Sequence, residues 1–296
     1  MFLFSGKNFF YKTAAALAVL TMMGCTSSAD SVSTTTKSEL QDRGDYYVDN
    51  TIASQNHDSR VKFLIMHYTV DNEEKALEHL TKGAVSSHYL VSQQPKKSHG
   101  KPVITQLVPE ERRAWHAGIS NWQNRTNLND SSIGIEIVNT GFTDNNGVRT
   151  WYPYTDEQIK AVALLAKDII QRHEIKPQYV LGHSDIAPAR KQDPGKLFPW
   201  QKLAEQGIGA WPDEATVTKY LAGRSPAAAG NMLTIQQTLK KYGYDTIPQT
   251  GVSDEATRTV ISAFQMHFRP SDISGRADAE TEAIAKALVE KYVTKS

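Results

Sequence analysis

Short apolar runs separated by polar turns mark the chain between residues 60 and 183, and these runs predict β-strands. The candidates are "VKFLIMHY" (residues 61–68), "SSHYLVS" (86–92), "VITQLV" (103–108), "SSIGIEIVN" (131–139) and "YVLGH" (179–183). In "SSIGIEIVN", Ile133, Ile135 and Ile137 occupy alternate positions. Because successive side chains of a strand point to opposite faces, Glu136 is expected on the face opposite the three isoleucines.

Helical spacing of apolar residues follows the first strand candidate and precedes the last. Asp71 is placed to cap a helix over residues 72–82, and residues 154–173 carry the clearest helix pattern in the chain. Thr155 and Gln158 predict a capping box at the start of this second helix. Strands that alternate with helices in this way predict an α/β fold, with a mixed central β-sheet flanked by helices.

The pattern changes after this larger domain, which is expected over residues 51–221. "AGRSPAAAG" (222–230) is rich in small residues and predicts a linker. Three helix-like segments follow, "NMLTIQQTLKKYGY" (231–244), "SDEATRTVISAFQMHF" (253–268) and "DAETEAIAKALVEKY" (278–292). Residues 231–296 are therefore expected to form a small all-α domain of three helices, in which His267 is interpreted as a structural residue.

Composition limits the number of domains, the class of partner and the types of metal ligand. The chain has 296 residues, of which 40% are hydrophobic, so it is long enough for one large or two ordinary domains with a packed core. Its 33 basic and 32 acidic side chains nearly cancel, and this balance argues against nucleic acid as a partner. Cys25 is the one cysteine, which excludes an intrachain disulfide and a zinc site built from several thiolates. Any metal ligands are then His, Asp or Glu.

The N-terminal segment has the pattern of an export signal. Two lysines precede the apolar run "TAAALAVLTMMGC", which is too short for a permanent membrane span, so residues 1–24 are expected to be a signal peptide. Gly24-Cys25 resembles a lipobox, in which the cysteine becomes the lipidated first residue of a mature bacterial lipoprotein. Residues 25–50 are polar and are expected to form a disordered tether. By resemblance to lipoprotein sorting signals, Thr26 favours the outer membrane of a Gram-negative cell, facing the periplasm.

The stretch "GHSDIAPARKQDPG" (182–195) brings a histidine, a lysine and an aspartate into one segment that two prolines interrupt. Pro188 disfavours an uninterrupted helix, so the segment is interpreted as a loop. His67 and His183 both end apolar strand candidates, and they are expected at one edge of the same sheet. With Asp193 they make two imidazoles and a carboxylate, the ligand set of an open tetrahedral zinc site. From spacing alone, a solvated loop and hydrogen-bonded core histidines are equally good explanations.

Six motifs in a fixed order point to a known family. They are "IMHYT", "SSHYLV", "RRAWHAGIS", "SIGIEIVN", "VLGHSDIAPARKQDPG" and "FPW", spread over residues 61–200. With these motifs the chain resembles the zinc-dependent N-acetylmuramoyl-L-alanine amidases of the type 2 amidase family, which share their fold with the peptidoglycan recognition proteins. The resemblance implies a Zn²⁺ cofactor bound by His67, His183 and Asp193, and it implies peptidoglycan and muropeptides as partners.

The same resemblance implies how the reaction proceeds. In such enzymes zinc polarises the lactyl carbonyl of N-acetylmuramic acid and lowers the pKa of the attacking water. Glu136 is expected to take the proton and pass it to the leaving L-alanine nitrogen, while Lys191 assists the developing oxyanion. His116 and Asn139 are expected to line the substrate groove, although His116 is equally well explained as a hydrogen-bonded residue behind the ligands. His88 is assigned to packing.

The C-terminal segment is similar to the three-helix peptidoglycan-binding domains that accompany such amidases. It departs from their pattern at "HFRPSDISGRADAET", a looser version of the usual second glycine turn. No expected catalytic residue lies beyond the linker. Deleting residues 229–296 is therefore expected to weaken cell-wall association and to spare hydrolysis of small muropeptides.

Two other functions are compatible with these residues. A peptidoglycan-binding protein without catalysis would keep the groove and release no peptide from purified cell wall. A zinc peptidase that cuts within the stem peptide would use the same metal chemistry, but its product would not carry L-alanine at the new amino terminus.

Overall fold

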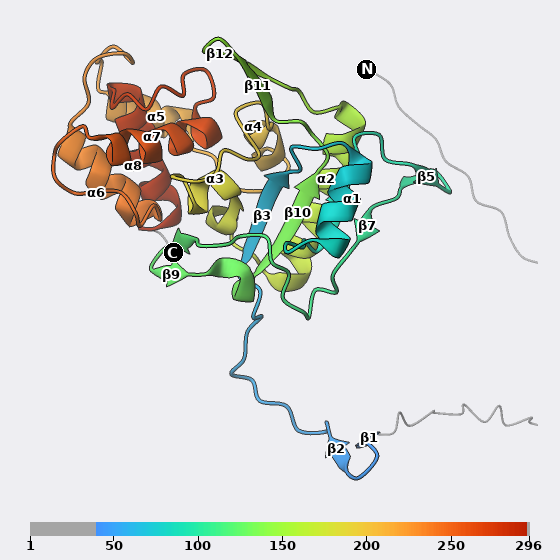
Figure 1. Ribbon diagram of the computed structural model, residues 1–296. Coiled ribbons are helices and arrows are strands. Elements are labelled where there is room, and N and C mark those ends of the chain that lie inside the picture. Colours follow the sequence, from blue (N-terminus) through green and yellow to red (C-terminus); the bar gives the residue numbers. More distant parts are fainter. Residues whose placement is uncertain (1–39, 295–296) are drawn as a thin grey trace, which may run out of the picture. The chain divides into compact units, whose positions relative to one another are not determined.

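The computed structural model describes residues 40–294 (Figure 1). The predicted signal peptide, the predicted lipidation site Cys25 and the first part of the predicted tether lie outside the described residues. The chain divides into two units, with the boundary between His57 and Asp58. Among residues 40–294, no helix combines the length and the apolar character that a membrane crossing requires.

The first unit contains a small hairpin. Leu40–Asp42 (β1) and Tyr47–Asp49 (β2) pair as antiparallel strands. Gly44 has a φ of +91°, and its N–H donates to Asp42 Oδ1 at 2.8 Å, which closes the turn between the strands. The prediction of a disordered tether is therefore wrong for these residues.

The second unit is built on a five-stranded sheet with the order β13–β3–β10–β4–β7. Its strands are β3 (Phe63–Tyr68), β4 (Tyr89–Val91), β7 (Thr105–Gln106), β10 (Ser132–Ile137) and β13 (Val180–Gly182). The first four strands in this order are parallel to one another, and β7 is antiparallel to β4. The predicted mixed sheet is thus confirmed. Because neighbouring strands are parallel, the carboxyl ends of β13, β3 and β10 lie at one edge of the sheet.

Helices cover both faces of the sheet. The α2 helix (Asp156–His173) packs on the face that carries the three isoleucines of β10, as their alternation predicted. The α1 helix (Glu73–Lys82) packs on the opposite face, where Ala76 and Leu80 contact Leu90 of β4. In Figure 1, β3 and β10 lie between α1 and the C-terminal helices.

The predicted start of α1 needs correction, and the predicted capping box of α2 is only partly formed. Asn72, and not Asp71, caps α1, because its Oδ1 accepts from the N–H of Lys75 at 3.1 Å. Thr155 caps α2 as predicted, with its hydroxyl oxygen accepting from the N–H of Gln158. The capping box is incomplete, because the Gln158 side chain is fully buried and donates instead to Val138 O at 2.8 Å.

Short elements connect these parts. They are β5 (Lys97–Ser98), β6 (Lys101–Pro102), β8 (Asn121–Trp122), β9 (Arg125–Thr126), η1 (Leu128–Ser131), β11 (Phe142–Asn145), β12 (Val148–Trp151), η2 (Pro177–Tyr179), α3 (His183–Ile186), α4 (Trp200–Ala204) and α5 (Glu214–Leu221). The α3 turn corrects the prediction that residues 182–195 are loop throughout. The chain completes one helical turn, closed by the bond from Ala187 N to His183 O, before Pro188 ends it.

Three further helices confirm the predicted all-α segment: α6 (Met232–Tyr242), α7 (Glu255–Phe268) and α8 (Ala279–Tyr292). We call residues 231–294 the helical module. The predicted linker is tied to this module, because Gly230 N donates to Ala277 O at 3.0 Å and Ala279 N donates to Ala228 O at 2.8 Å. The two predicted domains are therefore parts of one compact unit.

A buried glutamine holds the turn between α6 and α7. Gln236 accepts from the N–H of Gly251 at 2.7 Å, and its amide donates to Val252 O at 3.1 Å and to the hydroxyl of Thr257 at 2.9 Å. Asp254 then caps α7, with Oδ1 accepting from Thr257 N. One side chain thus joins a glycine turn to the start of the next helix.

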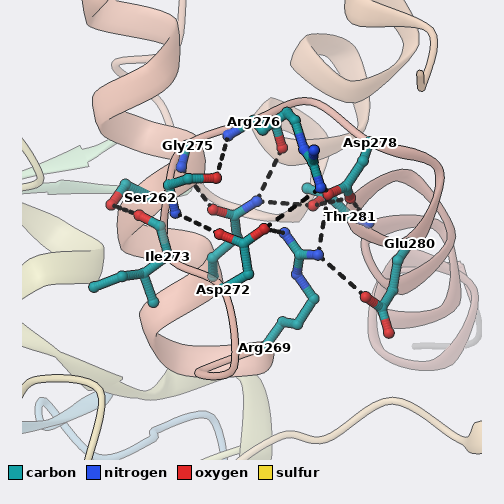
Figure 2. Close-up of polar contacts among 11 residues, drawn as sticks. Ser262, Arg269, Asp272, Ile273, Gly275, Arg276, Asp278, Glu280 and Thr281 are labelled. Atoms are coloured by element: carbon teal, nitrogen blue, oxygen red, sulfur yellow. Dashed lines mark hydrogen bonds and ion pairs between the residues drawn. The ribbon is translucent and has the colours of Figure 1, made fainter. Parts of the chain in front are cut away.

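The turn between α7 and α8 repeats this arrangement (Figure 2). Gln265 accepts from Gly275 N at 2.8 Å and donates to Arg276 O at 3.0 Å and to the hydroxyl of Thr281 at 2.9 Å. Asp278 caps α8 through Thr281 N. The second glycine turn, which is looser in sequence, is therefore as completely hydrogen-bonded as the first.

The hydrophobic core continues from the sheet into the helical module. Phe63 and Ile65 of β3 lie on the face opposite α2, in one buried cluster with Leu239, Phe264 and other module residues. Trp122, which is fully buried, contacts two tyrosines of the module at ring-centroid distances of 5.8 and 4.9 Å. The module therefore closes one side of the catalytic sheet.

Candidate active site

A cleft of about 190 Å³ lies at the carboxyl edge of the sheet. Six of the residues singled out from the sequence line it: His67, His116, Glu136, His183, Lys191 and Asp193. Apolar side chains of the rim, among them Val70, Val85 and the half-exposed Trp115, line its mouth. These rim residues carry no spacing signal, so the sequence pattern did not identify them.

Glu136 and His67 come from neighbouring strands. In the parallel register, Glu136 of β10 pairs with His67 of β3, so both side chains project from the same face. That face also holds Gly134, where a Cβ atom would lie 2.5 Å from Cγ of His116. A glycine two residues before Glu136 thus makes room for the imidazole of His116.

The loop after β13 folds back on itself, which explains why His183 and Asp193 act together although they are ten residues apart. Ser184 N donates to Asp193 O at 2.9 Å. A Cβ atom on Gly182 would lie 2.7 Å from Cδ of Pro194, so the two ends of the loop are in close contact. This closure places the Asp193 carboxylate beside His183, which directly follows β13.

The three candidate ligands converge on one point. Nδ1 of His67 lies 3.0 Å from Nδ1 of His183 and 3.0 Å from Oδ2 of Asp193, and the third side of this triangle is 3.1 Å. Ligand atoms around a tetrahedral ion with bonds of about 2.0–2.1 Å lie about 3.4 Å apart. The three residues are buried and fit a metal ion that keeps one position open.

Hydrogen bonds set the tautomers of the histidine ligands. Nε2 of His183 lies 3.0 Å from Ala117 O, which only accepts, so this nitrogen carries the hydrogen and Nδ1 is free for a metal. The tautomer of His67 follows from a series of hydrogen bonds that begins at Ser132, whose hydroxyl donates to Leu128 O at 2.7 Å. The Ser132 oxygen therefore accepts from Nε2 of His116 at 3.1 Å.

The same series of hydrogen bonds continues from His116 to the candidate ligand His67. With its hydrogen on Nε2, neutral His116 accepts at Nδ1, and Nε2 of His67 lies 2.9 Å away as the donor. The remaining nitrogen of His67, Nδ1, is then the one that faces Asp193. His116 thus lines the cleft and also orients a candidate ligand. Ser132 was not recognised from the sequence, because its role depends on a contact 16 residues away.

Burial and charge give His67 and Asp193 the protonation states that metal ligands require. Burial, together with nearby His183, lowers the pKa of His67 to about 4, so its imidazole is neutral at pH 7. Although burial alone would raise it, the pKa of Asp193 is lowered well below its usual range because His183 and His67 stabilise the carboxylate.

Glu136 has the properties of a proton-transfer group. Burial first, and the neighbouring Asp193 carboxylate second, raise the pKa of Glu136 well above its usual value, while Lys191 partly offsets the shift. Its Oε2 is buried and has no hydrogen-bond partner in residues 40–294. A buried carboxylate oxygen without a partner, beside a candidate metal site, is available to a substrate or a water.

Asn139 has a different role from the one predicted. It is buried and is absent from the residues that line the cleft. Its amide donates to Tyr152 O and Pro153 O, and its Oδ1 accepts from Gly141 N at 2.7 Å. Asn139 therefore shapes the turn after β10. His88 is also structural, as assigned: its Nδ1 accepts from Gly134 N.

Comparisons with known proteins agree with this site. Residues 57–196 match the family model described as N-acetylmuramoyl-L-alanine amidase, and residues 229–284 match one described as a peptidoglycan binding domain. Over 286 residues the chain is 49% identical to N-acetylmuramoyl-L-alanine amidase AmiD of Escherichia coli (strain K12). The aligned region covers 97% of this chain and 99% of AmiD. This chain belongs to the N-acetylmuramoyl-L-alanine amidase family.

Solved structures of the amidase family share the fold. A complex of Escherichia coli AmiD with the substrate anhydro-N-acetylmuramic acid-L-Ala-D-γ-Glu-L-Lys matches with a TM-score of 0.82 and 51% identity, over 86% of this chain and 98% of that one. AmpDh3 of Pseudomonas aeruginosa, in complex with an anhydromuramic pentapeptide, matches with a TM-score of 0.74 and 43% identity, over 85% and 98%. The match covers the amidase sheet and the helical module together.

Proposed function

We propose that this amidase hydrolyses the bond between N-acetylmuramic acid and L-alanine in peptidoglycan and muropeptides, with zinc as its metal. The observation that carries the proposal is the convergence on one cleft of two imidazoles, one carboxylate and a glutamate whose Oε2 has no hydrogen-bond partner in residues 40–294. The relationship to AmiD, whose complex contains an anhydromuramoyl peptide, supports the choice of substrate.

His67, His183 and Asp193 would hold the zinc. When bound there, zinc supplies a Lewis acid for the scissile carbonyl and lowers the pKa of water toward neutrality. The Ala117 carbonyl and His116 would keep the imidazoles turned toward the ion.

Glu136 moves the proton. Its Oε2 takes a proton from the attacking water and returns it to the leaving L-alanine nitrogen, so the amide bond breaks and a free amine and a carboxylate form. A raised pKa suits both steps, because the group holds the proton between them. Lys191, on the cleft wall, stabilises negative charge on the carbonyl oxygen.

Digestion of a defined anhydromuramoyl peptide tests the proposal. We expect a free peptide whose new amino terminus is L-alanine, identified by mass spectrometry and amino-terminal analysis. A new amino terminus further along the stem peptide would indicate a zinc peptidase. Binding to purified cell wall without any release of peptide would indicate a binding protein.

Replacing Asp193 with alanine is expected to remove the metal and the activity. Loss of one of three ligands leaves two imidazoles, too few for a stable zinc site. Zinc content of the purified variant should fall from about one per chain, and hydrolysis should drop below detection. Asp144→Ala, which removes an exposed carboxylate outside the cleft, is the matched control. Full zinc occupancy with full activity in the Asp193 variant would refute the ligand assignment.

We also propose that lipid attached to Cys25 anchors the amidase in the outer membrane, facing the periplasm. The support is the position of this one cysteine after an apolar export signal. Replacing Cys25 with serine should move the protein from the membrane to the soluble fraction after cell fractionation, with hydrolysis unchanged. A serine variant that still sediments with membranes would contradict the anchor.

A further inference from the structure

Asp185 joins the catalytic sheet to the helical module. It lies in α3, two residues after the candidate ligand His183, and its side chain is 1% exposed. The hydroxyl of Tyr244 donates to Oδ1 at 2.5 Å, and Nδ1 of His267 donates to Oδ2 at 2.7 Å. Both donors belong to the module. Both side-chain donors to this buried carboxylate therefore come from residues that follow the predicted linker in the sequence.

The same carboxylate also fixes the end of β13. Its Oδ2 accepts from the N–H of Gly182 at 2.7 Å, and Gly182 directly precedes His183. The next residue, Ser184, donates to the main-chain carbonyl of Asp193 at 2.9 Å. A displacement of α3 would therefore move two of the three candidate metal ligands.

Packing holds His267 in place. Its ring stacks on Trp200 at a centroid distance of 3.8 Å and on Phe268 at 3.9 Å, with interplanar angles of 17° and 6°. Its Nε2 is buried and has no partner in residues 40–294, so the bond to Asp185 is the polar contact of this ring. Stacking on two rings restrains the imidazole, whose Nδ1 donates to the Asp185 carboxylate.

We propose that Tyr244 and His267 are positioning residues for the metal site, acting through Asp185 to hold α3 so that His183 faces His67 and Asp193. The inference rests on the proposed function and gives the helical module a part in assembling the active site. Neither the two positioning residues nor Asp185 lines the cleft. Their effect is on the geometry of the ligands.

Two buried tyrosines offer a matched comparison. Tyr242 and Tyr244 are at most 1% exposed and both contact Trp122. The Tyr242 hydroxyl has no hydrogen-bond partner in the described chain, whereas the Tyr244 hydroxyl bonds to Asp185. Replacing either residue with phenylalanine removes one hydroxyl from the same core, but of these two changes only Tyr244→Phe removes a hydrogen bond to Asp185 of α3.

The experiment uses the full chain. It measures zinc affinity by competition with a chromogenic chelator, together with kcat, KM and thermal unfolding. We expect Tyr244→Phe to raise the zinc dissociation constant about 10-fold or more and to lower kcat with KM little changed, because partners behind metal ligands have effects of this size. Tyr242→Phe should bind zinc as the parent does. A merely structural role of the Tyr244 hydroxyl would lower the unfolding temperature of Tyr244→Phe and leave its zinc affinity unchanged.

His267 provides a second, independent pair. His267→Ala removes the donor and should weaken zinc binding, while His267→Asn keeps an N–H near the position of Nδ1 and should restore part of it. If Tyr244→Phe and His267→Ala both bound zinc with the affinity of the parent, this inference would be overturned and the proposed function would stand. Equal losses of zinc affinity in Tyr242→Phe and Tyr244→Phe would have the same consequence. A parent chain that neither binds zinc nor cleaves muropeptides would refute the proposed function and the inference with it.

Discussion

Replacing Glu136 with glutamine is expected to lower turnover about 10²–10⁴-fold, which corresponds to about 3–5 kcal/mol in the activation barrier. Glutamine keeps the size of the side chain but cannot accept the proton. Because Glu136 is not among the candidate ligands, zinc content and cell-wall binding should be unchanged. Single-turnover hydrolysis of a defined muropeptide, measured beside zinc content, tests this expectation.

Glu78→Gln is the control for this experiment. Glu78 is an exposed carboxylate on α1, the helix that borders the cleft, and it does not line the cleft itself. Its variant should hydrolyse at the parental rate. If the Glu136 variant also stays within a few-fold of the parent while zinc is bound, another group transfers the proton.

Deleting residues 229–296 is expected to prevent folding of the amidase, contrary to the expectation from the sequence. The deletion uncovers Phe63, Ile65, Trp122 and Leu181, which share a buried cluster with the module. Uncovering four large apolar side chains at about 1.5–3 kcal/mol each costs about 6–12 kcal/mol. This is comparable to the whole stability of a typical domain, about 5–15 kcal/mol. Soluble yield, circular dichroism and hydrolysis of a small muropeptide measure the outcome.

Removal of the other end is the matched control. A chain that begins at Asp58 keeps the second compact unit complete, so it should fold and hydrolyse the small substrate. A truncated chain without residues 229–296 that remained folded and active would show that the catalytic part is autonomous and that the shared core is dispensable.

The fold could be predicted where local pattern and tertiary packing agree. The alternating isoleucines of β10 and the helical spacing of α2 were sufficient because each element packs one face on the core. Asn72 displaced Asp71 as the cap of α1, and the two residues are equally good caps by type. The short α3 turn depends on hydrogen bonds with Asp193 and with the module, which no local window contains.

The part of the candidate site that lies at the ends of strands could be predicted from the sequence. His67, His183 and Glu136 leave strands at one edge of the sheet, so topology alone brings them together. Asp193 required the loop to fold back, and the resemblance to a family supplied what spacing could not. Asn139 was assigned to the groove because it follows the same strand as Glu136, but the turn after β10 uses its amide for backbone contacts. Asp185 lies inside the motif "VLGHSDIAPARKQDPG", but its role could not be predicted because its two side-chain donors lie 59 and 82 residues away.

The pairing of Glu136 with His67 across β10 and β3 has a consequence for the rate of the reaction. Adjacent strands are held about 4.8 Å apart by their ladder of backbone hydrogen bonds, which is among the stiffest parts of a protein. The proposed proton-transfer group and a candidate metal ligand therefore lose little rotational freedom when the substrate arrives, since folding has already ordered them. Substitutions that loosen this pair of strands should make the activation entropy less favourable, even where every reacting side chain is retained.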